Sequence, residues 1–293
     1  MVDGNQNIQI LKFTKPQACS SPMVISSPHS GSFYPNDLIQ ATHLNRVDLR
    51  SSEDCYIDEL LDSAPNLGAS LIAATYPRAY IDLNREAYEL DQEMFKDQLP
   101  EYINTHSIRV KDGLGTIARI VGNKKEIYAR KLSWLEAQVR IKEIYQPYHQ
   151  QLTQLIKEVH KKHGYCILLD FHSMPSKGLP LTDQRNAKTV DIVLGDVNGT
   201  SCSEIISDQA EKIFSDLGYS VLRNKPYSGG FITKNYGQPH LGVDAIQIEI
   251  KRNIYMDEKS LFRKPAFASL KNDLKKALEK MTQFLTNEYA NNN

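Results

Sequence analysis

The chain has 293 residues, of which 41% are hydrophobic and 24% are charged, a composition typical of a globular protein. Its 35 basic and 35 acidic side chains cancel to a formal net charge of zero, so nothing in the overall charge suggests a nucleic-acid or anionic-membrane partner. No apolar run approaches the roughly 20 residues that cross a bilayer, and the N-terminus lacks the pattern of a signal peptide. We therefore expect a cytoplasmic protein with a single domain over residues 1–293.

The first candidate for chemistry is a histidine that follows an early strand. Residues 23–26 are predicted to form this strand, and the turn-rich loop at 27–35 that follows it contains His29. Farther along, polar residues precede a predicted helix, so that Glu53 and Asp54 fall at its expected start. A carboxylate at that place is either a helix cap or a functional group.

Two arginines lie around the next predicted strands. Residues 70–76 and 79–83 read as two strands or one bent strand, with Arg78 between them and Arg85 just after them. The 86–125 segment is largely polar and contains scattered proline and glycine, so it predicts a long excursion from the domain, of the kind that often covers an active site. Two helices are then expected, from 126 to 145 and from Pro147 to about 164, as an antiparallel or kinked hairpin.

The central feature is an apolar run, beginning at residue 165, that ends on Asp170, His172 and Ser173. Such a run predicts a buried strand, and ligands of open α/β sheets bind beyond the carboxyl ends of these strands. Taken alone, His172 could equally be a hydrogen-bonded structural histidine.

The remaining pattern alternates strands and helices. Strands are predicted at 190–194, 219–222 and 245–252, and helices at 203–217 and 265–289. The last strand places Gln247, Glu249 and Lys251 on one face. This alternation predicts a largely parallel or mixed sheet with helices on both sides.

His29, His172 and one early acidic residue would together supply two imidazoles and a carboxylate. Catalytic zinc sites use such ligands and leave the fourth position to water, whose pKa the metal lowers. Glu249 could then act as the general base, unless it is an exposed residue on its strand.

Nearby arginines could supply the remaining groups that such a site needs. Arg78 could stabilise an oxyanion, and Arg85 with Asn84 could hold a substrate carboxylate. The alternative is that these arginines form salt bridges with Asp82 or Glu86.

In sequence order, these motifs resemble those of the N-formylglutamate amidohydrolases, the deformylases of histidine degradation. The matching segments are 27–31, 53–54, 78–85, 170–173, 194–202, 229–233, 236–237 and 247–249. The family is related to zinc carboxypeptidases and aspartoacylases, and the resemblance implies a three-layer α/β/α fold with a mixed, largely parallel central sheet and one zinc ion.

The resemblance also implies roles for particular residues. His29 and His172 become zinc ligands, with Asp54 as the acidic ligand, because family members usually have an aspartate there. Glu53 is the alternative, because the carboxypeptidase relatives use glutamate. Their HxxE motif is absent after His29, so the acidic ligand must come from the later predicted helix start. The general acid/base becomes Glu249. By the same resemblance, Arg78 would polarise the scissile carbonyl. Asn84 and Arg85 would bind the substrate carboxylate.

The leading hypothesis is therefore a zinc-dependent hydrolase of N-formyl-L-glutamate, a small-molecule substrate. Two alternatives stay open: a zinc hydrolase of another N-acyl amino acid or small peptide, and a non-catalytic ligand-binding relative. The sequence does not specify the oligomeric state.

Overall fold

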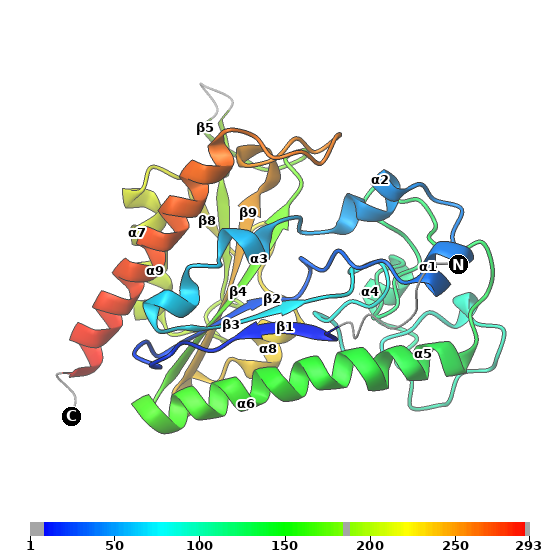
Figure 1. The fold of residues 1–293 in the computed structure, drawn as a ribbon, viewed down its shortest axis with the longest axis horizontal. Coiled ribbons are helices and arrows are strands. Elements are labelled where there is room, and N and C mark those ends of the chain that lie inside the picture. Colours follow the sequence, from blue (N-terminus) through cyan, green and yellow to red (C-terminus); the bar gives the residue numbers. More distant parts are fainter. Residues whose placement is uncertain (1–8, 184–187, 291–293) are drawn as a thin grey trace.

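A mixed β-sheet forms the centre of the computed structural model, which describes residues 9–183 and 188–290 (Figure 1). Within these residues the main sheet has seven strands in the order β1-β3-β2-β4-β9-β7-β8. The strands are β1 (Leu11–Thr14), β2 (Met23–Ser27), β3 (Ser70–Ala74), β4 (Cys166–Met174), β7 (Ile192–Gly195), β8 (Val221–Arg223) and β9 (Val243–Lys251). Strands β3, β2, β4 and β9 run parallel, whereas β1 and β7 pair antiparallel with β3 and β9. A separate pair joins β5 (Leu181–Asp183) to β6 (Lys188–Thr189).

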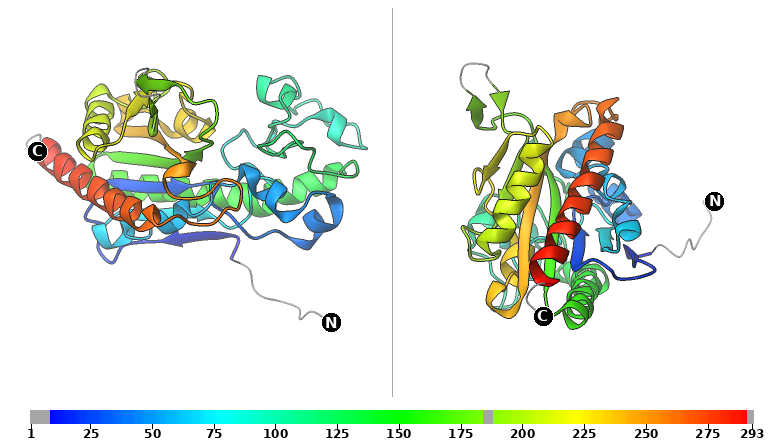
Figure 2. Two further views of the ribbon diagram at one scale, coloured as in Figure 1. Left: turned by 90° about the horizontal axis from the view of Figure 1, so that it is seen from above. Right: turned by 90° about the vertical axis from the view of Figure 1, so that its left-hand side faces the viewer.

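Helices cover both faces of this sheet (Figure 2). The α-helices of the described residues are α1 (Asn36–Ala41), α2 (Arg46–Leu49), α3 (Ile57–Leu60), α4 (Ile108–Lys111), α5 (Trp134–Arg140), α6 (Gln146–His163), α7 (Glu204–Asp216), α8 (Phe231–Tyr236) and α9 (Ala266–Ala290). No described helix is both long and apolar enough to span a membrane.

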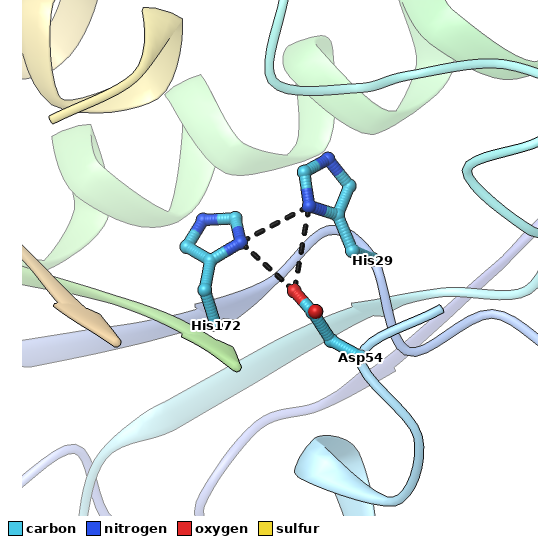
Figure 3. Close-up of side chains that lie close together, drawn as sticks. All are labelled: His29, Asp54 and His172. Carbon is cyan, nitrogen blue, oxygen red and sulfur yellow. Dashed lines mark hydrogen bonds and ion pairs between the residues drawn. The ribbon is translucent and has the colours of Figure 1, made fainter. Parts of the chain in front are cut away.

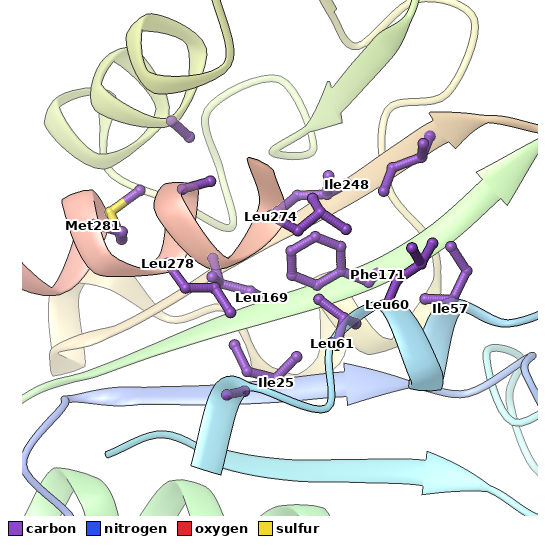
Figure 4. Packing of buried hydrophobic residues seen from close by; sticks show 14 of the residues in the cluster. Ile25, Ile57, Leu60, Leu61, Leu169, Phe171, Ile248, Leu274, Leu278 and Met281 are labelled. Carbon is purple, nitrogen blue, oxygen red and sulfur yellow. The ribbon is translucent and has the colours of Figure 1, made fainter. Parts of the chain in front are cut away.

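Successive residues of the central strands face opposite layers, because side chains alternate along a strand. Leu169 and Phe171 of β4 belong to the buried cluster formed with α3, α7 and α9 (Figure 4). The intervening Leu168 packs in the other cluster with Tyr148 and Leu152 of α6. The three-layer α/β/α prediction is confirmed, and both faces of β4 are covered as its continuous apolar run requires.

The predicted strand at 79–83 is wrong. This segment forms turns, in which the backbone amides of Tyr80 and Ile81 donate to the carbonyl of Pro77 at 2.8 and 3.2 Å. Local hydrogen bonds therefore replace the ladder bonds that a strand would need.

The predicted helical hairpin is also wrong. α5 begins at Trp134 behind a capping box of Ser133 and Glu136, and it continues through a π-helical turn (Ile141–Tyr145) into α6. Pro147 has no amide hydrogen to donate within the helix, and the π-helical turn lies directly before the first turn of α6, where this donor is missing.

The 86–125 segment has little regular structure, as predicted, but it is internally packed. Its buried apolar side chains join residues of the following segment in a small cluster separate from the two main ones. The cluster contains Leu90, Met94, Phe95, Leu99, Ile103, Ile117, Leu132 and Ala137. In Figure 1 this segment and α4 lie beyond the strand ends, away from α7 and α9.

Candidate metal centre and substrate pocket

The candidate site lies where neighbouring parallel strands end. β2, β4 and β9 are adjacent and parallel, so their carboxyl ends meet at one edge of the sheet. His29 follows β2, while His172 and Glu249 are direct register partners near the ends of β4 and β9. The backbone amide of Asp54 donates to the carbonyl of His29 at 3.0 Å, which brings the carboxylate to the same place.

His29, Asp54 and His172 form a compact buried cluster (Figure 3). The two Nδ1 atoms are 3.0 Å apart, and Oδ2 of Asp54 lies 3.1 Å from Nδ1 of His172 and 3.5 Å from Nδ1 of His29. All three residues are at most 2% exposed. Thus one ligand atom from each residue converges on a common point.

Carboxylates hold the outer nitrogens of both histidines. Nε2 of His29 lies 2.7 Å from Oδ1 of Asp82, and Nε2 of His172 lies 3.0 Å from Oδ2 of Asp170. Asp170 also accepts a hydrogen bond from Ser26 Oγ at 2.8 Å. Each ring that donates from Nε2 directs its Nδ1 lone pair inward, as in carboxylate–histidine–metal arrangements.

The donor set fits a divalent cation. When both rings donate outward from Nε2, the two Nδ1 lone pairs and the carboxylate oxygen repel one another unless a positive charge, carried by a proton or a metal ion, lies between them. Two nitrogens and one oxygen suit zinc and leave a coordination position open. His29, Asp54 and His172 are therefore the residues that could hold the metal ion.

Asp54 stays ionised in this site. Burial by itself would raise the pKa of its carboxyl group, but the contacts with His172 and His29 hold that pKa well below its usual range, and the charge of Arg252 lowers it further. Arg252 Nη2 donates to Asp54 Oδ1 at 3.1 Å, and Ser173 Oγ donates to the same atom at 2.9 Å. Asp54 thus presents an anionic carboxylate oxygen in a fixed orientation.

Glu53 lies outside the cluster. Its carboxylate accepts hydrogen bonds from Nε and Nη2 of Arg50, both at 2.9 Å, and from the hydroxyl of Tyr34 at 2.9 Å. The structure therefore brings Asp54 to the histidines and leaves Glu53 in an ion pair. Neither residue caps the helix, because α3 begins at Ile57 with Tyr56 as its N-cap, so the predicted helix start is wrong.

A cavity of about 150 Å³ adjoins the cluster, and all seven residues predicted from the sequence line it. They are His29, Asp54, Arg78, Asn84, Arg85, His172 and Glu249. Tyr227, Gln247 and Arg109 also line it. Arg109 comes from the 86–125 segment, to which the family motifs do not extend.

Glu249 is placed to exchange protons. Burial raises the pKa of Glu249 to about 7; His172 opposes this rise and the charge of Asp54 adds to it. Gln247 Nε2 donates to Glu249 Oε1 at 2.8 Å, which orients the carboxylate. A buried carboxyl with a pKa near neutrality is well suited to general acid–base catalysis.

The polar side chains of the 78–85 segment are anchored around the cavity. Arg78 Nε donates to Asp82 Oδ2 at 2.8 Å, which is the salt bridge expected from the alternative interpretation. Arg78 nevertheless also lines the cavity. Asn84 Oδ1 accepts the backbone amide of Ile232 at 2.7 Å. Gly230 permits this approach, since a Cβ atom there would lie 2.3 Å from Asn84 Nδ2.

A known family matches most of this chain. The family model for N-formylglutamate amidohydrolase matches residues 21–256. The N-formylglutamate deformylase of Pseudomonas putida is 30% identical over 242 residues, covering 82% of this chain and 84% of that protein. The N-formylglutamate deformylase of Pseudomonas aeruginosa is also 30% identical, over 244 residues and with the same coverage of both chains.

Solved structures are similar as well. The crystal structure of N-formylglutamate amidohydrolase from Ralstonia eutropha JMP134 has a TM-score of 0.86 and 33% identity, covering 95% of this chain and 99% of that chain. A gene product of Agrobacterium tumefaciens has a TM-score of 0.64 at 15% identity and covers 94% of both chains. The second similarity extends to the fold alone.

Proposed function

This chain belongs to the N-formylglutamate amidohydrolase family, and we propose that it hydrolyses N-formyl-L-glutamate to formate and L-glutamate with the help of a zinc ion. The observation that carries this proposal is the buried convergence of His29, Asp54 and His172 beside Glu249 in one cavity. The resemblance to the deformylases of histidine degradation suggests the same metabolic role here.

The metal ligands would be His29 Nδ1, His172 Nδ1 and Asp54 Oδ2. When bound, a zinc ion supplies Lewis acidity, which polarises a carbonyl and makes a water molecule more acidic. Asp82 and Asp170 keep the two imidazoles in the orientation that this ligation needs.

Glu249 moves the proton in the proposed reaction. It takes a proton from the attacking water as the water oxygen bonds to the formyl carbon, and it gives that proton to the nitrogen as the C–N bond breaks. Arg78 donates to the oxygen of the formyl group as negative charge develops there. Arg85 and Asn84 hold the α-carboxylate and thus position the scissile bond.

The direct test is formate release from N-formyl-L-glutamate by the purified protein as isolated, after chelation and after zinc is restored. We expect chelation to abolish release and zinc to recover it. Acetylaspartate and short peptides should be poor substrates under the same conditions. Failure of the folded, zinc-loaded protein to release formate would contradict the proposed activity, and turnover unaffected by chelation would contradict the metal requirement.

A further inference from the structure

Arg109 is an arginine of the 86–125 segment that lines the same cavity as the metal cluster. It belongs to α4, and its side chain is exposed to solvent. Among the described residues, no hydrogen bond or ion pair engages its guanidinium group. Its donors are therefore available to an anion in the cavity.

Local hydrogen bonds hold the backbone that carries this side chain. Ser107 caps α4 by accepting the amide of Val110 at 3.0 Å, and its hydroxyl also donates to the carboxylate of Glu89. The carbonyl of Arg109 itself accepts the amide of Leu114 at 2.7 Å. Because this backbone is already ordered, binding a ligand has to order only the side chain and not the segment.

Arg85, by contrast, is already partly engaged. Its Nε donates to the carbonyl of Leu114 at 2.9 Å, its Nη1 donates to the carbonyl of Asn84 at 2.7 Å, and its Nη2 lies 3.8 Å from Asp82 Oδ2. The donors that remain can serve one carboxylate but leave little for a second. The 86–125 segment thus both anchors Arg85, through Leu114, and contributes Arg109.

The charges that line the cavity favour a doubly anionic ligand. Three guanidinium groups, on Arg78, Arg85 and Arg109, face two carboxyl groups, on Asp54 and Glu249. A bound divalent cation would increase this positive excess. Carboxylates of the ligand would neutralise it, and arginine binds carboxylate with suitable geometry.

We propose that Arg109 binds the side-chain carboxylate of a dicarboxylic N-acyl amino acid, while Arg85 binds its α-carboxylate. The 86–125 segment then selects acidic substrates, whereas the sheet edge carries out the hydrolysis. This inference rests on the proposed function of the same site and adds the determinant of its substrate class.

The test compares N-formyl-L-glutamate with N-formyl-L-glutamine, whose side chain has a similar shape but no charge. In the zinc-loaded Arg109→Gln variant, kcat/KM for formylglutamate should fall about 10- to 100-fold, mainly through KM, because a hydrogen bond to a charged group is lost. The value for formylglutamine should stay unchanged. Lys111→Gln is the matched control, since it removes a positive charge from the same helix outside the cavity and should leave both values unchanged.

An unchanged preference for formylglutamate in Arg109→Gln would overturn the inference, and so would an equal loss for both substrates, which would indicate a structural role. Calorimetric binding of L-glutamate and L-glutamine to the same zinc-loaded proteins separates this inference from the proposed reaction. Selective loss of glutamate binding in Arg109→Gln supports the role of Arg109 even when no formate is released. Absent glutamate binding in the unsubstituted protein, or equal binding in both proteins, counts against it.

Discussion

The sheet edge and the 86–125 segment hold their polar groups in different ways. At the sheet edge, the β-ladder register places His172 opposite Glu249, and helices cover both faces of the strands. In the 86–125 segment, side-chain-to-backbone bonds and a small apolar cluster place α4 and its Arg109. In the proposed function, metal binding and proton transfer therefore belong to the sheet edge, while recognition of the substrate belongs to a loop segment that can vary without changing the sheet.

The largest effect should come from removing a metal ligand at the sheet edge. We expect His172→Ala to lose bound zinc and to reduce formate release below detection, because two ligands hold a catalytic metal poorly. Metal content and activity are the measurements. His163→Ala is a control, since His163 lies at the end of α6 with its Nε2 3.2 Å from the carbonyl of Cys19. Retained zinc in His172→Ala would refute the assigned ligand set.

A slightly smaller effect should follow from removing the carboxyl group of Glu249, the proposed proton carrier. Glu249→Gln should lower kcat by about 10²- to 10⁴-fold and leave zinc content unchanged, since Glu249 lies outside the ligand cluster. Steady-state kinetics together with metal analysis would check this. Activity near that of the unsubstituted protein would favour a different base or the non-catalytic alternative.

The pH dependence should report on the same carboxylate. Burial raises the pKa of Glu249 to about 7, and a general base acts only when deprotonated. Therefore kcat/KM should fall about tenfold per pH unit below that pKa, and the charge of a bound cation would shift this limb to lower pH. A pH profile of kcat/KM is the measurement. A profile that shows no fall at its acidic end would contradict the role of Glu249.

The smallest effect should come from loosening the 86–125 segment. Ser107→Ala removes the cap of α4 and should cost about 1 kcal/mol of stability, while raising KM for formylglutamate more than it changes kcat. Thermal unfolding and steady-state kinetics would measure these effects. Ser133→Ala removes the comparable cap of α5, which carries no cavity residue, and should cost similar stability without raising KM. Equal KM values in the two variants would show that the position of α4 does not control recognition.

The sequence by itself determined the sheet-edge residues. The long apolar runs of β4 and β9 require buried strands, and polar groups at the ends of parallel strands must meet at one edge. The predictions of His29, His172 and Glu249 followed from this logic together with ordered family motifs. Strand periodicity is a local signal, so one chain suffices to read it.

Only the tertiary structure decided between Asp54 and Glu53, because adjacent carboxylates look alike in sequence and their partners, Arg252 and Arg50, lie at different distances along the chain. It also decided that Arg109 reaches the cavity. That segment has no long periodic element, and its path depends on contacts such as that of Arg85 with Leu114, which no local pattern encodes. The sequence also did not predict the turns at 77–83 or the π-helical turn before Pro147. Both depend on local backbone hydrogen bonds, which hydrophobic periodicity does not report.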